Sequence, residues 1–407
     1  MSTDRLEELL RKALNDLHST GSLKGNEKII TGIKSPENDF GPRYYLKGEG
    51  KKEFLRMNSN SYLGLSLHSR VITAEEEATI RYGAGPGAVR FISGTFEPHI
   101  ELEQALADFH GREDAMIFSS AYSTVMGVLS LLISEDTLVI SDSLNHNCII
   151  NAIKLARPAS KAVYPHLDMD GLNKALKEGC GKSKRAIVVT DGVFSMRGDH
   201  APLHKIVRIC RNYEDMFEEG IITVADDSHG VGAFGKRGRG TEEVTGAKVD
   251  ILIATLGKSI GINGGYVAAN STIIRFLREK APFYVYSNPI TPSEAAAALK
   301  ALQILESQEG RKLLESLSSL TNQLKQGINT LGFETLEGYH PIVPLMIRNT
   351  EKTKQWVNYL FDKGVLATGL NYPVVPKGDE EIRFQVSASH TRGDINYLLE
   401  TLKGFKE

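Results

Sequence analysis

The sequence lacks the features that mark exported, membrane-spanning and metal-binding proteins. Its three cysteines, Cys148, Cys180 and Cys210, are far apart and form no CxxC pair, which argues against a disulfide framework and a thiolate zinc site. No apolar run approaches the length of a membrane span, and the first residues form no apolar signal region. A formal net charge of -2 gives no reason to expect nucleic acid or an anionic membrane as a partner. We therefore expect a soluble, cytoplasmic protein without a metal site.

Two common nucleotide-binding motifs are also missing. The chain has no GxxxxGK[ST] segment, which argues against a P-loop nucleotidase. The glycine-rich run at 83–87 lacks GxGxxG spacing and follows helix-like sequence, which argues against a dinucleotide fold. With 407 residues, of which 41% are hydrophobic, the chain can instead form a substantial core shared by a larger and a smaller lobe.

From about residue 66, short apolar strands alternate with helical stretches such as 203–211. The expected strands are 115–118, 137–140, 186–190, 221–225, 251–255 and 265–268. This alternation predicts an α/β fold with a doubly wound, mostly parallel sheet. Ligands of such sheets bind beyond the carboxyl ends of the strands, so the residues after each strand are the first candidates for a site.

The two ends of the chain have other patterns. Leucines and an alanine at helical spacing over 6–17 predict an amphipathic helix, and 44–46 with 53–57 predict a β-hairpin around the turn 48–50. A capping box at 291–294 opens a long helical region that reaches about residue 331. A strand at 342–347, a helix at 352–360, a strand at 382–386 and a terminal helix then predict a small α/β lobe. The expected division is 1–57 (helix and hairpin), 58–291 (large domain) and 292–407 (linking helix and small domain).

Polar side chains follow four of the expected strands at one edge of the predicted sheet. They are His146, Ser195, Asp226 with His229, and Thr255 with Lys258. One such residue would more often be structural, and a lone lysine there would more often lie on the surface. A lysine after a buried strand is nevertheless costly unless its amine is uncharged or covalently used. A lysine, a carboxylate, imidazoles and hydroxyls at one rim fit pyridoxal 5'-phosphate (PLP).

Ordered segments along nearly the whole chain resemble the α-oxoamine synthases, fold-type I PLP enzymes that join an amino acid to an acyl-CoA. The segments are 60–65, 90–95, 226–229, 235–240 and 255–258. Within this family, segments 141–146, 190–196, 284–288, 372–378 and 387–391 are similar to glycine C-acetyltransferases. Arg197 departs from the acidic residue that is usual at its position.

The resemblance implies roles for four catalytic residues. Lys258 would carry PLP as a Schiff base and then remove the α-proton of the amino acid. Asp226 would pair with the pyridine nitrogen and keep it protonated, because an adjacent anion favours a cation. His146 would stack on the ring, and His229 would hydrogen-bond near the ring oxygen.

The resemblance also implies contacts to the phosphate and to the substrates. The amides of Ala121 and Tyr122, where small residues open a helix, would hold the phosphate with Thr255. Ser287 and Asn288 would come from a second subunit of a homodimer with shared active sites. The remaining contacts would be Ser195 to the ring oxygen and the substrate, and Arg383, assisted by Asn60, to the substrate carboxylate.

The expected reaction joins glycine to acetyl-CoA and releases CoA, giving 2-amino-3-ketobutyrate, or runs in reverse in threonine breakdown. One alternative is another amino acid or acyl-CoA with loss of the carboxylate, as in 8-amino-7-oxononanoate synthase or serine palmitoyltransferase. A different alternative is a non-catalytic scaffold of the same fold. Lys258 and Asp226 together argue against a scaffold, which need not keep both residues.

Overall fold

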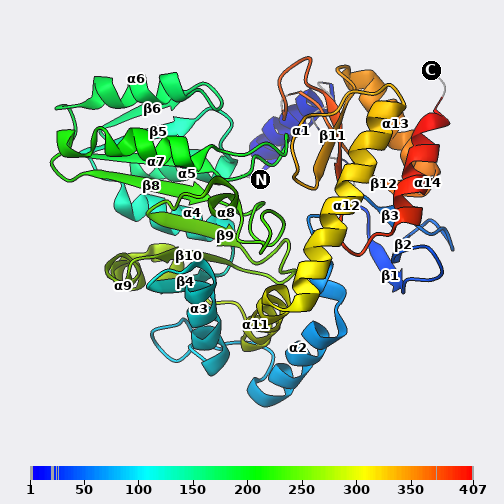
Figure 1. The fold of residues 1–407 in the computed structure, drawn as a ribbon, viewed down its shortest axis with the longest axis horizontal. Coiled ribbons are helices and arrows are strands. Elements are labelled where there is room, and N and C mark those ends of the chain that lie inside the picture. Colours follow the sequence, from blue (N-terminus) through cyan, green and yellow to red (C-terminus); the bar gives the residue numbers. More distant parts are fainter. Residues whose placement is uncertain (1–2, 20–22, 24, 26, 373, 406–407) are drawn as a thin grey trace.

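The large lobe is built on a seven-stranded sheet (Figure 1). The computed structural model describes residues 3–19, 23, 25, 27–372 and 374–405. The strands are β4 (Asp114–Phe118), β5 (Thr137–Asp142), β6 (Ser160–Tyr164), β7 (Arg185–Asp191), β8 (Ile221–Asp226), β9 (Ile251–Thr255) and β10 (Gly265–Ala269). In the order β4-β10-β9-β8-β7-β5-β6, only the two pairings of β10 are antiparallel. The predicted mostly parallel sheet is confirmed, and only the exposed edge strand β6, which has little apolar pattern, was missed.

Helices cover both faces of this sheet, because successive strand residues point to opposite sides. On one face, α4 (Ala121–Leu132), α5 (Asn147–Ala156), α9 (Ser271–Lys280) and α10 (Pro282–Val285) bury an apolar core that includes Ile187. On the other face, α6 (Met169–Gly179) and α7 (Leu203–Arg211) pack on a core that includes Val188. The shorter elements of this lobe are the 3-10 helix η2 (Glu214–Met216) and α8 (Thr241–Thr245).

Two helices join the lobes, where the sequence predicted one long helical region. Helix α11 (Pro292–Glu306) begins at the predicted capping box of Thr291 and Glu294, and α12 (Gln308–Thr330) follows it. The break is at Ser307, whose side chain caps α12 and whose backbone is extended. A Cβ at Gly310 would lie 2.1 Å from Leu305 O, so glycine permits the close corner between the helices. Helices η1 (Leu65–Leu67), α2 (Ser69–Tyr82) and α3 (Glu97–His110) complete this region.

The small lobe contains a three-stranded antiparallel sheet, in the order β11 (Ile342–Met346), β14 (Glu381–Gln385) and β13 (Thr368–Leu370). Helices α13 (Thr350–Asp362) and α14 (Arg392–Lys403) complete it, as predicted. Pro373, within the segment 372–378 of the resemblance, lies outside the described residues. Among the described residues, no helix has the length and apolar character needed to cross a bilayer.

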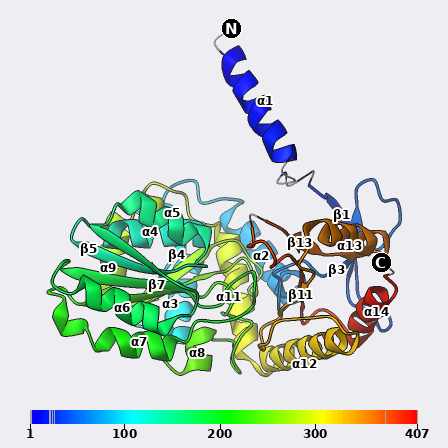
Figure 2. The same cartoon turned by 90° about the horizontal axis from the view of Figure 1, so that it is seen from above.

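The predicted N-terminal hairpin is confirmed at one antiparallel bridge but not as a pair of strands. Strand β2 (Arg43–Leu46) pairs with β1 (Ile30–Lys34), and it meets the segment 53–57 only at the bridge between Tyr44 and Phe54. Strand β3 (Leu55–Arg56) instead pairs in parallel with β12 (Val365–Leu366), because Phe54 and Leu55 are buried against the small lobe. Helix α1 (Asp4–Ser19) forms as predicted and projects from the body with no residue buried (Figure 2). The domain boundaries at 57 and 291 stay a proposal.

Candidate active site

Lys258 lies in the turn after β9, at the edge where the parallel strands β5, β7, β8 and β9 end. Burial lowers the pKa of its amine to about 8, although the carboxylates of Asp226 and Asp191 oppose this shift. The positive charge of Arg383 adds to the lowering. A lysine with this pKa has a usable uncharged fraction near neutral pH, and an uncharged amine can act as a nucleophile or a base.

Asp226, the last residue of β8, holds one carboxylate oxygen firmly and leaves the other open. Its Oδ1 accepts hydrogen bonds from Ser228 Oγ at 2.5 Å and Ser228 N at 3.1 Å. Within the described part of the chain, its Oδ2 accepts only a weak contact from Cys148 Sγ at 3.7 Å. An oriented carboxylate with one free oxygen can accept a hydrogen bond from the protonated nitrogen of a pyridine ring.

Asp191, which the sequence did not single out as a site residue, lies beside Asp226. The two residues are register partners at the ends of β7 and β8. Burial, and then the Asp226 charge, raise the pKa of Asp191 well above its usual value. Its Oδ2 accepts a hydrogen bond from the backbone N–H of His146 at 3.0 Å, which fixes the start of α5. Its position directly after a predicted strand was the signal that could have identified it.

His146 caps α5 and exposes its ring at the rim. Its Nδ1 accepts a hydrogen bond from Cys148 N at 3.2 Å. Partial burial lowers the pKa of His146, and the Asp226 carboxylate opposes this effect. The ring is therefore uncharged at neutral pH, and its flat face is suited to the predicted stacking on an aromatic cofactor.

His229 is held from two sides by residues that the sequence did not predict. Tyr62 Oη lies 2.9 Å from its Nδ1. His340 Nδ1 accepts from Ile342 N at 3.1 Å, so its Nε2 carries the proton and donates to His229 O at 2.9 Å. Burial lowers the pKa of His340 to about 3 and that of His229 well below its usual value, with Lys258 adding to the latter shift. Tyr62 lies in the marker segment 60–65, whereas no sequence signal marked His340.

The predicted phosphate contacts lie around Gly265. Ala121 and Tyr122 are the first residues of α4, where backbone N–H groups have no intrahelical acceptor. A Cβ at Gly265 would lie 2.3 Å from Ala121 N, so only glycine lets β10 approach the start of α4 this closely. Thr255 is the register partner of Gly265 on β9. The structure thus brings Ala121, Tyr122 and Thr255 to one helix N-terminus, which favours an anion.

The three predicted substrate residues also come together. Arg383 Nη1 donates to Ser195 O at 2.7 Å, across the boundary between the lobes. The Gln385 amide oxygen, when it faces Arg383, accepts from Nε at 3.1 Å and Nη2 at 3.0 Å. The same amide group lies 2.9 Å from Asn60 Oδ1. These contacts orient the guanidinium and leave donors for a carboxylate.

Ser287 and Asn288, expected to reach the phosphate of a second subunit, lie in the loop after α10. Asn288 is exposed, and within the described residues Ser287 Oγ makes only a 3.5 Å contact with Asn288 O. Both side chains are therefore placed where another copy of the chain could use them. Their role stays a prediction.

A cavity of about 60 Å³ lies beside Ser195, between the lobes. Its apolar walls are Leu144, Phe194, Met196, Val374, Val375 and Pro376. Glu381 also lines it and is buried, and its Oε1 has no hydrogen-bond partner among the described residues. Burial raises the pKa of Glu381 to about 8, against the effect of Arg383 and Arg197. The space suits about two water-sized groups and therefore a small substituent.

Known proteins share this chain's sequence over almost its whole length. Residues 52–402 match the family described as aminotransferase class I and II. The 8-amino-7-oxononanoate synthase of Thermosipho melanesiensis is 37% identical over 377 residues, covering 92% of this chain and 93% of that protein. The mitochondrial 2-amino-3-ketobutyrate coenzyme A ligase of Bos taurus is 35% identical over 399 residues, covering 97% and 91%. The chain belongs to the α-oxoamine synthases, within that family.

Solved serine palmitoyltransferases share the fold of this α-oxoamine synthase. The S. paucimobilis enzyme, solved with PLP and myriocin bound, has a TM-score of 0.86 and 28% identity over 99% of this chain and 96% of its own. Another such structure also contains PLP. PLP is the cofactor of this α-oxoamine synthase, and the residues present fit it. Lys258 supplies an amine of lowered pKa, Asp226 a free carboxylate oxygen, and the start of α4 unpaired N–H groups.

Proposed function

We propose that the protein joins the α-carbon of a small amino acid to the acyl carbon of an acyl-CoA and releases CoA. The observation that carries this proposal is the position of Lys258. Its amine, with a pKa lowered to about 8 by burial, lies at a rim that also holds the Asp226 carboxylate and the Arg383 guanidinium. Bound PLP supplies an electron-withdrawing ring that makes the α-proton of the amino acid acidic.

The residues of the chain then have distinct tasks. Lys258 would hold the cofactor through its amine, and the same amine would take up the α-proton. Asp226 keeps the ring nitrogen protonated, since its Oδ2 is free to pair with it. His146 would cover one face of the ring, and the uncharged His229 is positioned by Tyr62 and His340.

Substrate orientation depends on the residues that join the two lobes. Arg383 binds the carboxylate of the amino acid with the donors that Ser195 and Gln385 leave free, and Asn60 lies beside the Gln385 amide. A bidentate guanidinium would restrict the orientation of the α-carbon relative to Lys258. The small cavity beside Ser195 then favours a compact substituent on one of the two substrates.

Two acyl donors deserve direct comparison. 8-Amino-7-oxononanoate synthases predominate among the similar relatives, which favours a donor with a longer chain and loss of the amino-acid carboxylate. Two observations favour glycine with acetyl-CoA and retention of the carboxylate. They are the similarity to the 2-amino-3-ketobutyrate coenzyme A ligase and segments such as 190–196 and 387–391. We place the 8-amino-7-oxononanoate synthase reaction first and the glycine reaction second.

A substrate panel separates these functions. Glycine, alanine and serine are each combined with acyl-CoA esters of increasing chain length, and free thiol and carbon dioxide are measured. Thiol with carbon dioxide, from an acyl chain that ends in a carboxylate, supports the first function. Thiol without carbon dioxide, from glycine and acetyl-CoA alone, supports the second. If PLP-loaded protein releases no thiol with any combination of amino acid and acyl-CoA, the result would favour the scaffold alternative.

We further propose a cytoplasmic homodimer in which Ser287 and Asn288 of each subunit contact the phosphate of the other. The N-terminus of α4 is the position they would reach. Mixing a Lys258→Ala subunit with an Asn288→Asp subunit tests this sharing. Activity of the mixture above that of either variant alone requires a shared site, and an additive result contradicts it.

A further inference from the structure

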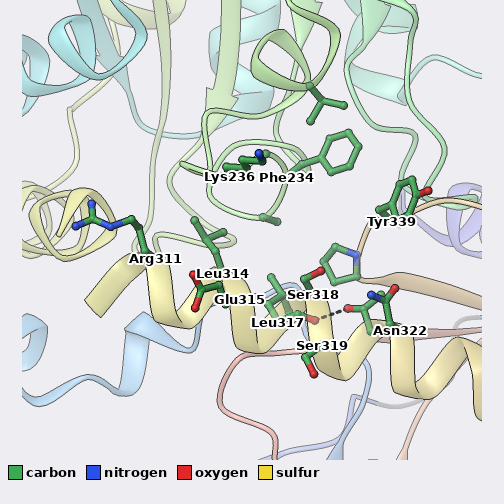
Figure 3. A pocket seen from close by; sticks show the side chains of 15 residues that line it. Phe234, Lys236, Arg311, Leu314, Glu315, Leu317, Ser318, Ser319, Asn322 and Tyr339 are labelled. Atoms are coloured by element: carbon green, nitrogen blue, oxygen red, sulfur yellow. Dashed lines mark hydrogen bonds between the residues drawn. The ribbon is translucent and has the colours of Figure 1, made fainter. Parts of the chain in front are cut away.

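A second cavity of about 990 Å³ lies between the two lobes, on residues that the proposed reaction does not use. We call it the α12 cavity. The loop 233–236 and Val244 of the large lobe form one side, and residues 311–322 of α12 with Tyr339 and Pro341 form the other. Figure 3 shows Phe234 and Lys236 facing the side chains of α12, with Tyr339 and Asn322 at one end and Arg311 at the other. A volume of this size is typical of small-molecule sites.

The floor of the α12 cavity is apolar, and its rim carries unmatched charge. Phe234, Leu314 and Leu317 are buried floor residues. In the described part of the chain, Lys236 and the rim residue Glu315 form no ion pair. Among the residues that the structure describes, the Arg311 side chain makes only a 3.4 Å contact with Glu306 O. Two cations and one carboxylate leave an excess of one positive charge, which a single carboxylate would balance.

We propose that the α12 cavity binds a small monocarboxylate with an apolar body, such as a medium-chain fatty acid. Lys236 and Arg311 would attract the carboxylate, since charge-assisted hydrogen bonds to an anion are the strong ones. The apolar body would lie on Phe234, Leu314 and Leu317, where each buried methylene contributes about 0.8 kcal/mol. A phosphate monoester carries a second negative charge, and the rim has no further excess cation to balance it. We therefore do not expect a phosphate monoester to bind.

The α12 cavity is connected to the active site by direct contacts. The ring of Phe234 lies 5.8 Å, centroid to centroid, from that of His340, and Tyr339 and Pro341 flank His340 in the chain. His340 in turn donates its hydrogen bond to His229 O. A ligand that fills the cavity therefore touches both lobes and Phe234, whose ring contacts His340. We expect it to change the affinity for the amino-acid substrate.

Calorimetric titration of the PLP-loaded enzyme tests the binding site. Glycine and coenzyme A are present at saturation, so that Arg383 and the acyl-donor site are occupied. We expect octanoate to bind about fourfold more tightly for each methylene beyond hexanoate, with 1-octanol weaker than octanoate. The exposed rim residue Ser318, changed to Trp, should place its indole over the apolar floor beside Leu314 and Leu317 and weaken octanoate binding at least tenfold.

Charge variants give a matched comparison. Lys236→Gln should weaken octanoate binding severalfold and leave 1-octanol binding unchanged, while the exposed neighbour Lys312, outside the cavity, should tolerate the same change without effect. Equal octanoate affinity in the wild type and Ser318→Trp, or displacement of octanoate by an acyl-CoA, would overturn the site.

Steady-state kinetics test the connection to the active site. Octanoate should change the KM of the amino-acid substrate at least twofold in the wild type and not in Ser318→Trp. An unchanged KM at saturating octanoate would refute the coupling. Because calorimetry measures octanoate binding without any turnover, its result tests the α12 cavity independently of the proposed reaction.

Discussion

Replacing Asp227 with asparagine should remove a pH-dependent cost of folding. Asp227 follows Asp226 directly, and its carboxylate is fully buried. It accepts hydrogen bonds from Thr241 N at 2.6 Å and Thr241 Oγ1 at 2.7 Å. A Cβ at Gly240 would lie 2.0 Å from this carboxylate, so the site excludes water and side chains. Asparagine can keep both contacts, because the threonine hydroxyl can accept a hydrogen bond as well as donate one.

The magnitude follows from the pKa of Asp227, which burial raises from 3.8 to about 7 while the bonds from Thr241 oppose the shift. The folded protein keeps the proton up to about pH 7, whereas the unfolded chain releases it near pH 3.8. Unfolding therefore releases a proton in this window, and wild-type stability falls as the pH rises through it. At 1.36 kcal/mol per pKa unit, the cost reaches about 4 kcal/mol above pH 7.

Denaturant unfolding of PLP-loaded wild type and Asp227→Asn, compared at pH 5 and pH 8, measures this effect. The advantage of the variant should grow from about 1.5 to about 4 kcal/mol between these values, while its visible PLP band stays unchanged. The same change at the exposed Asp215 should give no such trend. A difference between Asp227→Asn and the wild type that is independent of pH would refute the argument that Asp227 is protonated on folding.

Three further changes test the site and its support. Lys258→Ala should abolish the covalent label left by borohydride reduction of the PLP-loaded enzyme, and a label of wild-type intensity would exclude this lysine. Gly265→Ala should weaken PLP binding at least tenfold by pushing the start of α4 away, which titration of the apoenzyme with PLP measures. Burial lowers the pKa of His166, but the hydrogen bonds and charges of Asp142 and Asp199 outweigh burial and raise this pKa to about 9. The unfolding free energy of His166→Gln should therefore be lower than that of the wild type by up to about 3 kcal/mol at pH 6, and the difference should shrink as the pH rises through 9. An equal difference at pH 6 and above pH 9 would contradict this.

Local patterns were sufficient to predict the elements that carry the chemistry. Strands buried on both faces appear as continuous apolar runs, so the residues that follow them, such as Asp226 and Lys258, could be placed at one rim. The capping box at Thr291 is likewise a local signal, and the structure contains it. The break at Ser307 was missed because both of its flanks are good helix formers.

Contacts between the lobes could not be predicted in this way. Tyr62, His229 and His340 meet although 278 residues separate the first from the last, and no periodicity encodes that meeting. The strand partner of Leu55 was misassigned for the same reason, since burial against the small lobe outweighed the local hairpin pattern. Backbone propensity acts over a few residues, whereas these pairings depend on how two complete cores pack.

The sequence by itself determined the order of strands along the chain, the rim lysine and its carboxylate, and the resemblance to PLP enzymes. Only the tertiary structure decided that Asp191 lies beside Asp226, that His340 supports His229, and that Arg383 reaches Ser195. It also decided that Lys258 loses enough hydration to lower its pKa to about 8. The physical reason is that burial and charge are properties of the surroundings of a side chain, which distant segments supply.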